Sequence, residues 1–491
     1  MGVSHARPNL LVLMADQFRS DLLGVNGSTS CRTPTLDRLA AEGVSFTRAY
    51  TTCPLCTPAR GALFTGRYPH RNGLTANVQY PETPTPRLPE GERLLFEHLA
   101  TGGYRCGYVG KWHLNYGDES QEAHRRGVAD FFAGRQAASL HRQRLRLPAR
   151  EDVGRGRERT MAGEHPPMSG VAPYPEAYHL DAGIAGQAVE VLRGYTREGV
   201  GTGARPFALV CSFHGPHFPI EVPEPWASLY QPQDVPRPAS FDDTFACKPP
   251  GQRTHPWLQL ASHLSWPEWQ RVIAHYWGFA TYVDAMMGRV LDALDETGLT
   301  GRTVVLATAD HGEMAGHHRM FDKGPYLYED VMRVPFVWRV PGASRGGAGH
   351  TDGRLVSHVD VVPTLLELTD VRPAAGSPRL HGRNLTGEVG APVLRRPAAG
   401  PPHVAHQPVA VFGETNAGDR VNPQLDTRMV IAGAHKYVFR PGDVDELYDL
   451  DDDPEELRNV AHDATYRGVR HELESRLKLW MAETEDRLAW R

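Results

Sequence analysis

The strongest constraint on the fold of this chain is the alternation of short apolar runs with helical patterns along its length. The best apolar runs are Leu10–Met14, Tyr108–Val109, Phe207–Phe213, Val304–Thr308 and Val334–Val340. Buried strands that alternate with helices are typical of a mainly parallel sheet covered on both faces. The sequence therefore predicts an α/β fold with a large mixed, mainly parallel sheet sandwiched by helices.

Two of the segments between these runs have clear helical signals. After Thr33, Pro34 suits a first helical turn and Gly43 suits a helix end. A longer helix is predicted over about Glu268–Asp295, where aromatic and apolar residues recur at helical spacing. We interpret this apolar stripe as core rather than as a ligand site.

Two irregular stretches suggest how the chain is divided. Residues 117–175 are rich in Arg and poor in periodicity, which predicts an insertion or long loop within a large domain of residues 1–390. This segment could recognise an anionic sugar through Arg, or it could be a solvated loop. Residues 372–408, rich in Pro, Gly and Ala, suggest a linker. Residues 391–491 are predicted to form a small α+β subdomain with short antiparallel strands and a terminal helix over about 464–484.

The composition limits the class of partner. Lys and Arg number 53 against 58 Asp and Glu, a formal net charge of −5. A near-neutral chain without a long basic block is not typical of proteins whose main partner is nucleic acid or an anionic membrane. No apolar run approaches the roughly 18–20 residues of a membrane span, and no secretory hydrophobic region precedes the first strand. We therefore expect a cytoplasmic protein whose six cysteines stay reduced.

Two of the predicted strands end in side chains that could bind a metal. The first strand delivers Asp16 and Gln17, and the strand at Val304–Thr308 leads to Asp310 and His311. Ligand sites of open α/β sheets lie at the carboxyl ends of the strands. Carboxylate and amide oxygens suit hard divalent cations. Either pair alone could be an ordinary strand-to-loop turn, but together they predict a cation site.

A third element is a cysteine placed next to a helix N-terminus. Thr57 can cap a helix and Pro58 fits its first turn, so Cys56 is expected just before the helix begins. The helix dipole and the cation of Arg60, one turn along, would activate the thiol. A zinc site with Cys53 is disfavoured because no second Cys or His pair lies nearby.

Several motifs now resemble one known family in order along nearly the whole chain. Cys56-Thr57-Pro58-Ala59-Arg60 resembles the C-x-P-x-R signature of the type I, formylglycine-dependent sulfatases of the alkaline phosphatase superfamily. The other matching motifs are Gly110–His113, Phe213–Pro219, Asp310–Glu313, Phe321–Gly324, His358–Thr364 and Glu446–Leu450. The resemblance implies an alkaline-phosphatase-like fold and hydrolysis of a small-molecule or saccharide sulfate ester.

The resemblance also implies a role for each candidate residue. Cys56 would be oxidised to formylglycine by a separate formylglycine-generating enzyme, and one hydroxyl of the hydrated aldehyde would attack sulfur. The second hydroxyl would then expel sulfate. The implied metal ligands are Asp16, Gln17, Asp310, His311 and the modified Cys56. Lys111, His113, His217 and Lys323 would contact sulfate, Arg60 would add positive charge, and His217 or Lys323 would protonate the leaving oxygen.

The chain departs from the commonest sulfatase pattern at both metal positions. Asp16-Gln17 and Asp310-His311 stand where many sulfatases carry Asp-Asp and Asp-Asn, so we expect calcium first, with manganese or magnesium as alternatives. The same pairs resemble phosphonate monoester hydrolases and phosphodiesterases of the superfamily, whereas Lys111 and His113 favour sulfate. A third hypothesis is a non-catalytic anion-binding protein with an unmodified Cys56.

Overall fold

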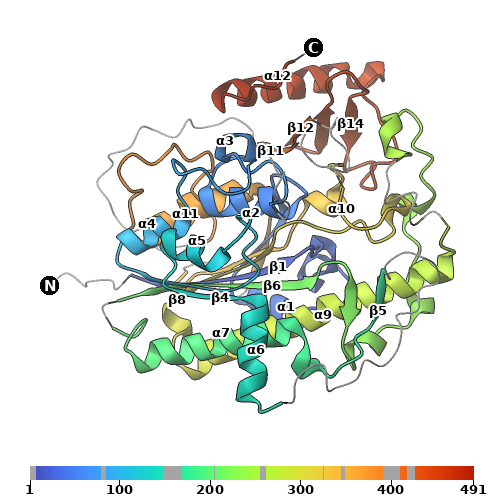
Figure 1. Ribbon diagram of the computed structural model, residues 1–491. Helices are drawn as coiled ribbons and strands as arrows, with labels where there is room; N and C mark the ends of the chain where they lie inside the picture. Colours follow the sequence, from blue (N-terminus) through green and yellow to red (C-terminus); the bar gives the residue numbers. More distant parts are fainter. Residues whose placement is uncertain are drawn as a thin grey trace.

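The computed structural model describes residues 7–78, 85–147, 168–203, 205–254, 261, 263–324, 326–343, 349–390, 410–416 and 426–490. Within these residues the main sheet has eight strands in the order β10-β2-β9-β8-β1-β6-β3-β4 (Figure 1). Their bounds are β1 (Asn9–Asp16), β2 (Val44–Tyr50), β3 (Arg105–Gly110), β4 (Asp130–Ala133), β6 (Phe207–Pro216), β8 (Thr303–Ala309), β9 (Phe336–Arg339) and β10 (His350–Ser357). Only β9 runs antiparallel to its neighbours among the described pairs. The mixed, mainly parallel sheet is confirmed.

Helices cover both faces of this sheet, as Figure 1 shows. One face carries α2 (Cys56–Thr65), α4 (Leu95–Thr101), α5 (Glu119–Arg125) and α11 (Val361–Leu368). The other carries α1 (Pro34–Ala41), α6 (Gly134–Arg144), α7 (Leu180–Arg197) and α9 (Trp266–Glu296). Every residue of β1 is buried, because helices pack on both of its sides. The apolar stripe of α9 is core, as predicted: Trp269, Tyr276 and Val283 are fully buried.

A smaller antiparallel sheet follows near the C-terminus, at the upper right of Figure 1. Its strands are β11 (Ala410–Thr415), β12 (Thr427–Ala432), β13 (His435–Phe439) and β14 (Glu446–Asp449), and α12 (Arg467–Glu483) lies along it. Leu473, Leu477 and Trp480 of α12 are buried with Val430 and Tyr437 of the sheet. The predicted small α+β unit is present. The exact division between residues 390 and 391 stays a prediction.

The expectation of a loop over residues 117–175 is wrong for much of that segment. It contains α5, the edge strand β4, α6 and the short β5 (Ser169–Val171), which pairs with β7 (Ile220–Val222). Buried Phe131, Ala137 and Ala138 anchor it, although the Arg residues before and after them obscure the periodicity. Residues 148–167 lie outside the described residues.

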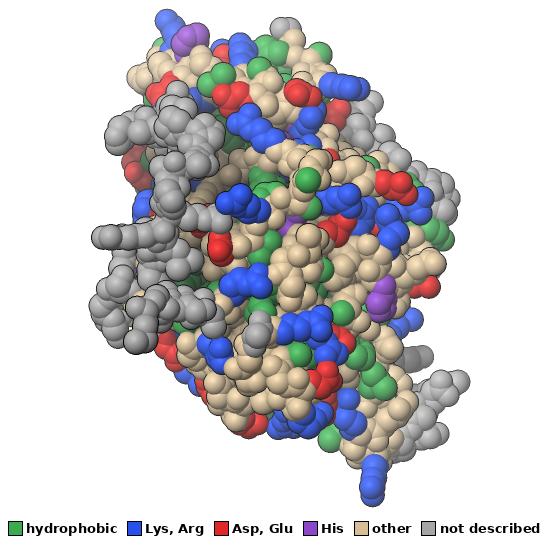
Figure 2. Space-filling model, turned by 90° about the vertical axis from the view of Figure 1, so that its left-hand side faces the viewer, with side chains coloured by type: hydrophobic (Ala, Val, Ile, Leu, Met, Phe, Trp, Pro, Cys, Tyr) green, Lys and Arg blue, Asp and Glu red, His purple; other side chains and the backbone are tan. Residues whose placement is uncertain are grey.

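Two short helices complete the described elements that matter below: α3 (Pro69–Asn72) and α10 (Glu329–Met332). On the face drawn in Figure 2, Lys and Arg side chains are interspersed with Asp and Glu. Among the described residues, no helix combines the length and the hydropathy that crossing a membrane requires.

Candidate active site

The ends of β1 and β8 bring the predicted metal-binding side chains together. The two strands pair in parallel, with Ala15 opposite Ala309, so Asp16 and Asp310 follow at adjacent positions. The backbone N–H of Asp310 donates to the carbonyl of Ala15 over 3.2 Å. Both carboxylates are fully buried. Two residues almost 300 positions apart in the chain therefore share one site because of the strand order.

Cys56 lies at the centre of this site. Its Sγ atom is 3.3 Å from His311 Nε2 and 3.8 Å from Asp16 Oδ1. One ligand atom from each of Asp16, Cys56, Asp310 and His311 falls within 4.8 Å of the others. The Nδ1 atom of His311 contacts the carbonyl of Gly312 at 2.9 Å, which leaves Nε2 directed at Cys56. Two carboxylates and one imidazole around a central side chain fit a divalent cation.

The start of the α2 helix differs from the prediction in one detail. Thr57 does not cap it: the helix begins at Cys56 itself, and the Thr57 hydroxyl donates to the carbonyl of His113 over 2.9 Å. The backbone N–H of Thr57 instead donates to Asn77 Oδ1 over 3.0 Å. A side chain from a separate loop thus satisfies a free N–H of the first turn. Cys56 remains at the positive end of the helix dipole.

Arg60 holds the two carboxylates in place. Its guanidinium is fully buried and pairs with Asp16 Oδ2 through Nη2 and with Asp310 Oδ2 through Nε, both over 2.8 Å. Its Nη1 donates to the Lys111 carbonyl over 2.7 Å and to Ser212 Oγ over 2.9 Å. These contacts leave the Oδ1 atoms facing Cys56 and Gln17. In the structure Arg60 therefore contacts the carboxylates of Asp16 and Asp310, the two predicted metal ligands.

Three further cationic or protonatable side chains surround Cys56. Lys111 Nζ lies 2.6 Å from Asp16 Oδ2 and 3.6 Å from Cys56 Sγ. Lys323 Nζ lies 2.6 Å from His217 Nε2, and that nitrogen is 3.8 Å from Asp16 Oδ1. Burial would raise the pKa of the Cys56 thiol, but the charges of Lys111, Lys323 and His311 hold this pKa well below its usual value. The surroundings favour negative charge at position 56.

His113 lies on the same side of Cys56 as Lys111. Burial lowers the pKa of its imidazole to about 4, and the ring is in hydrogen-bond contact with Cys56. Its Nδ1 atom is buried and has no hydrogen-bond partner within the described part of the chain. Its backbone N–H donates to Glu119 Oε1 over 3.3 Å, in a left-handed backbone conformation with φ 56°. The contact with Cys56 places the other ring nitrogen beside any group bound at that position.

Gln17 links the metal-binding side to Lys323. Its backbone N–H donates to Asp310 Oδ1 over 3.0 Å, and its amide oxygen accepts from Lys323 Nζ over 2.9 Å. Its amide nitrogen donates to Asp322 Oδ1 over 2.8 Å and contacts Glu313. The predicted ligand oxygen of Gln17 thus accepts a hydrogen bond from lysine.

Sequence reasoning assigned no role to Glu313, Asp322, Glu119 or Asn77. Glu313 and Asp322 belong to the motifs around Asp310 and Lys323, so their position in those motifs was an available signal. Burial and the neighbouring Asp322 raise the pKa of Glu313 to about 7. These two carboxyl groups orient the Gln17 amide. Asn77 gave no comparable signal, because its contact with α2 is tertiary.

The comparison with protein families decides the identity of this site. The family model described as Sulfatase matches residues 8–371. The chain belongs to the sulfatase family. The predicted family and its hydrolase class are thereby confirmed.

Similar proteins span nearly the same length as this sulfatase. It is 27% identical over 493 residues to the uncharacterized sulfatase YidJ of Escherichia coli (strain K12), covering 98% of this chain and 88% of that protein. It is 26% identical over 494 residues to an arylsulfatase of Clostridium perfringens (strain 13 / Type A), covering 94% and 92%. The crystal structure of a phosphonate monoester hydrolase of Agrobacterium radiobacter superposes with a TM-score of 0.75 at 28% identity, covering 97% and 96%.

Proposed function

We propose that this sulfatase hydrolyses a sulfate monoester to an alcohol and inorganic sulfate, with a nucleophile formed from Cys56. The observation that carries the proposal is the position of Cys56 Sγ between a cation-binding group and a cationic group. Asp16 Oδ1 and His311 Nε2 lie 3.8 Å and 3.3 Å from it, and Lys111 Nζ lies 3.6 Å from it. A sulfate group bound there would meet the positive charge of Lys111 and of a bound cation.

Asp16, Gln17, Asp310, His311 and the modified Cys56 would hold one divalent metal, with calcium first and manganese or magnesium as alternatives. When bound, the metal supplies positive charge that lowers the pKa of an attacking hydroxyl and neutralises sulfate oxygens. Arg60 fixes both carboxylates by paired contacts of 2.8 Å, so their free oxygens face the site before any ligand arrives. The positions of these two carboxylates are therefore fixed before a charged ligand binds.

The nucleophile requires oxidation of Cys56 to formylglycine by a separate formylglycine-generating enzyme. Burial of Cys56 in the folded chain limits access to its thiol, so we expect oxidation before folding is complete. Lys111 and His113 then bind sulfate oxygens: the ammonium group contributes charge, and the imidazole contributes the ring nitrogen that contacts Cys56. Under the third hypothesis Cys56 stays an unmodified thiol, and the protein binds anions without catalysis.

The leaving oxygen receives its proton from the Lys323–His217 pair. The Nδ1 atom of His217 contacts the carbonyl of Phe218, so this nitrogen carries the hydrogen and Nε2 accepts. Lys323 Nζ, 2.6 Å from that Nε2, is then the atom that holds the transferable proton. The His217 side chain is 26% exposed, so it connects the pair to solvent.

Phosphonate ester hydrolysis is a second candidate function, because the similarity to the Agrobacterium radiobacter phosphonate monoester hydrolase extends over 97% of this chain. The test is a comparison of kcat/KM for an aryl sulfate and an aryl phosphonate monoester with the same leaving group. We expect sulfate to be preferred, and Lys111→Ala to reduce the sulfate rate more than the phosphonate rate. A preference for the phosphonate by orders of magnitude would replace the sulfatase proposal. Absence of both activities, with Cys56 still a thiol after coexpression with an active formylglycine-generating enzyme, would favour anion binding.

A further inference from the structure

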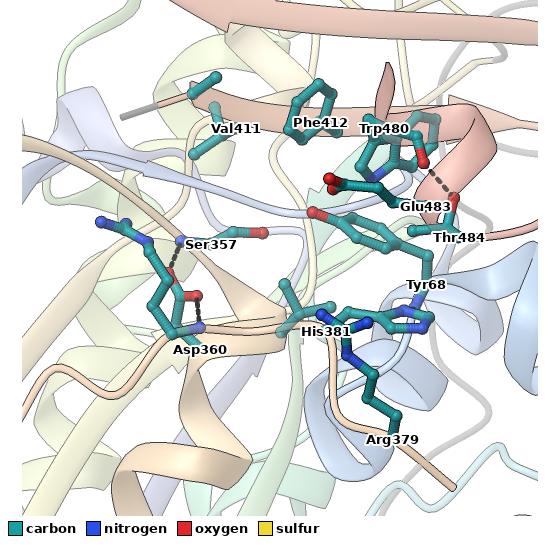
Figure 3. Close-up of a pocket in the computed structure, with 13 residues that line it drawn as sticks. Tyr68, Ser357, Asp360, Arg379, His381, Val411, Phe412, Trp480, Glu483 and Thr484 are labelled. Carbon is teal, nitrogen blue, oxygen red and sulfur yellow. Dashed lines mark hydrogen bonds and ion pairs between the residues drawn. The ribbon is translucent and has the colours of Figure 1, made fainter. Parts of the chain in front are cut away.

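A second cleft lies between the main domain and the C-terminal sheet, away from Cys56 (Figure 3). The α2 helix connects the two places: Cys56 begins it, and Tyr68 in the cleft follows three residues after its last residue, Thr65. A ten-residue helix is about 15 Å long. None of the predicted catalytic or metal-binding residues lines the cleft. It is therefore a separate site rather than an extension of the catalytic one.

Two hydroxyl groups point into this cleft from opposite sides. Figure 3 shows the Ser357 hydroxyl and the Tyr68 hydroxyl directed toward each other across the cavity. Ser357 is 3% exposed, and its Oγ atom is buried without a hydrogen-bond partner within the described ranges. Buried polar atoms are nearly always hydrogen-bonded. An unpartnered hydroxyl aimed into a cavity indicates that a polar ligand supplies the missing bond.

The charged groups of the cleft are balanced. Arg383 lies 3.4 Å from Asp360 and donates to the carbonyl of Leu355 over 2.6 Å. Figure 3 shows Glu483 beside the Tyr68 ring, and Arg379 contributes a guanidinium on the other side of that ring. A lining with carboxylates, guanidinium groups and hydroxyls offers acceptors as well as donors. This mixture suits ligand hydroxyls, which both donate and accept, better than it suits a polyanion.

The walls of the cleft are aromatic and held firmly. Phe412 stacks on Trp480 with ring centroids 5.0 Å apart and planes at 3°. Tyr68 meets Trp480 edge-on at 4.9 Å and stacks against His381 at 5.5 Å. These contacts come from both parts of the chain, so the cleft is already shaped in the free protein. Aromatic faces beside fixed polar groups are typical of sites that bind the C–H surface and hydroxyls of a ring.

We propose that this cleft binds one sugar ring and is a non-catalytic saccharide site. The cavity measures about 200 Å³, below the roughly 300–1,000 Å³ of sites for drug-sized ligands, so it accommodates one ring rather than a chain. Ser357 and Tyr68 bind hydroxyls of the ring, Glu483 accepts from them, and the aromatic wall packs on its apolar surface. The proposal does not depend on the chemistry at Cys56.

The test is saturation-transfer NMR on full-length Cys56→Ala protein with unsulfated methyl glycosides of glucose, galactose, mannose and glucuronic acid. We expect millimolar binding of at least one glycoside. The Tyr68→Phe, Ser357→Ala double variant should weaken that binding at least about tenfold, because it deletes two hydrogen bonds to the ligand. Phe keeps the ring contact with Trp480, and a melting curve checks that the double variant folds.

Glu483→Gln is the second variant, because Glu483 is exposed and its substitution leaves the core intact. It should weaken the same binding, whereas Arg71→Ala outside the cleft should not. No binding by any of the four glycosides would overturn the proposal. Binding that both cleft variants leave unchanged would also overturn it, since the sugar would then lie elsewhere. Because the protein used has no nucleophile, these results are independent of whether sulfate esters are hydrolysed.

Discussion

The site around Cys56 and the cleft around Tyr68 lie at opposite ends of α2 and differ in how their polar groups are satisfied. At Cys56 the charged groups pair with one another: Arg60 bridges Asp16 and Asp310, and Lys111 contacts Asp16. In the cleft the Ser357 hydroxyl has no partner among the described residues. A network of paired charges is suited to stabilising a charged transition state, whereas an unpaired hydroxyl is suited to a neutral ligand.

The two regions also differ in their origin along the chain. The Cys56 site depends on strand order in the main sheet, which places Asp16 beside Asp310. The cleft depends on how α12 and β11 pack against the segment that follows β10. Substitutions at Cys56 should therefore change catalysis with little effect on the C-terminal unit. Substitutions within the C-terminal unit should change stability first.

The largest effect is expected for Cys56→Ala. Sulfate release from an aryl sulfate should fall at least about a thousandfold, because the nucleophile is lost while the binding groups remain. Cys53→Ala is the matched control: Cys53 is equally buried three residues earlier, and its loss should cost stability but not the reaction. Equal activity of the Cys56 and Cys53 variants would contradict a nucleophile at position 56.

Removal of the metal should have the next largest effect. Dialysis of matured protein against EDTA is expected to lower kcat at least about a hundredfold, because the metal no longer lowers the pKa of the attacking hydroxyl or neutralises the sulfate oxygens. Calcium should restore activity, and manganese and magnesium are the comparison ions. Elemental analysis checks that the metal is gone. Full activity in verified metal-free protein would rule out a metal role.

Lys323→Met should reveal the proton donor through the leaving group. For an alkyl sulfate we expect a loss of about a hundredfold in kcat/KM, since an alkoxide must be protonated as it leaves. For 4-nitrophenyl sulfate the loss should be much smaller, because nitrophenolate leaves without a proton. The exposed Lys478→Met serves as control. Equal losses on both esters would assign Lys323 to binding rather than to proton transfer.

Arg428→Met should destabilise the C-terminal unit by about 3 kcal/mol, the scale for breaking a buried ion pair. Arg428 and its partner Asp486 have side chains only 3% and 2% exposed, so the substitution leaves a buried carboxylate unpaired. Denaturant unfolding measures the loss. The ratio of sulfate to phosphonate turnover should stay the same, and a change in that ratio would show that the C-terminal unit shapes the catalytic site.

Arg71→Ala should have the smallest effect, lowering the free energy of unfolding by less than about 1 kcal/mol. Arg71 Nη1 lies 2.6 Å from Glu485, but the Glu485 side chain is 73% exposed, so water and salt screen this pair. The same unfolding experiment compares it with Arg428→Met. A loss as large as that of Arg428→Met would mean that exposed ion pairs hold the C-terminal unit in place.

Patterns that are local in the chain predicted the centre of the fold and of the site. The apolar run at Leu10–Met14 predicted β1, and Asp16 after it predicted a candidate metal ligand at the end of that strand. Edge strands were harder to predict from the sequence. β10 has Asp352 and Arg354 in its middle, and β4 is only four residues long and lies in an Arg-rich segment. Their strand conformation depends on a neighbouring strand to pair with, which no local pattern reports.

The features of the site that could not be predicted from the sequence have the same physical cause. Thr57 followed by Pro58 is typical of a helix start, but Asn77 from another loop satisfies the N–H of Thr57 and the helix begins two residues earlier, with Leu55 before its first residue. Whether Arg60 would face substrate or carboxylates could not be predicted from its spacing, because its partners come from β1 and from the loop after β8. Contacts of this kind depend on tertiary packing.

The most direct test of the account is mass spectrometry of the tryptic peptide Ala49–Arg60, from protein coexpressed with a formylglycine-generating enzyme. We predict an aldehyde or its hydrate at Cys56, trapped by a hydrazine, while Cys53 in the same peptide stays a thiol. Sulfate release should rise in proportion to the converted fraction. Two unmodified thiols, obtained with a maturation enzyme shown to be active on a control peptide, would contradict the proposed nucleophile.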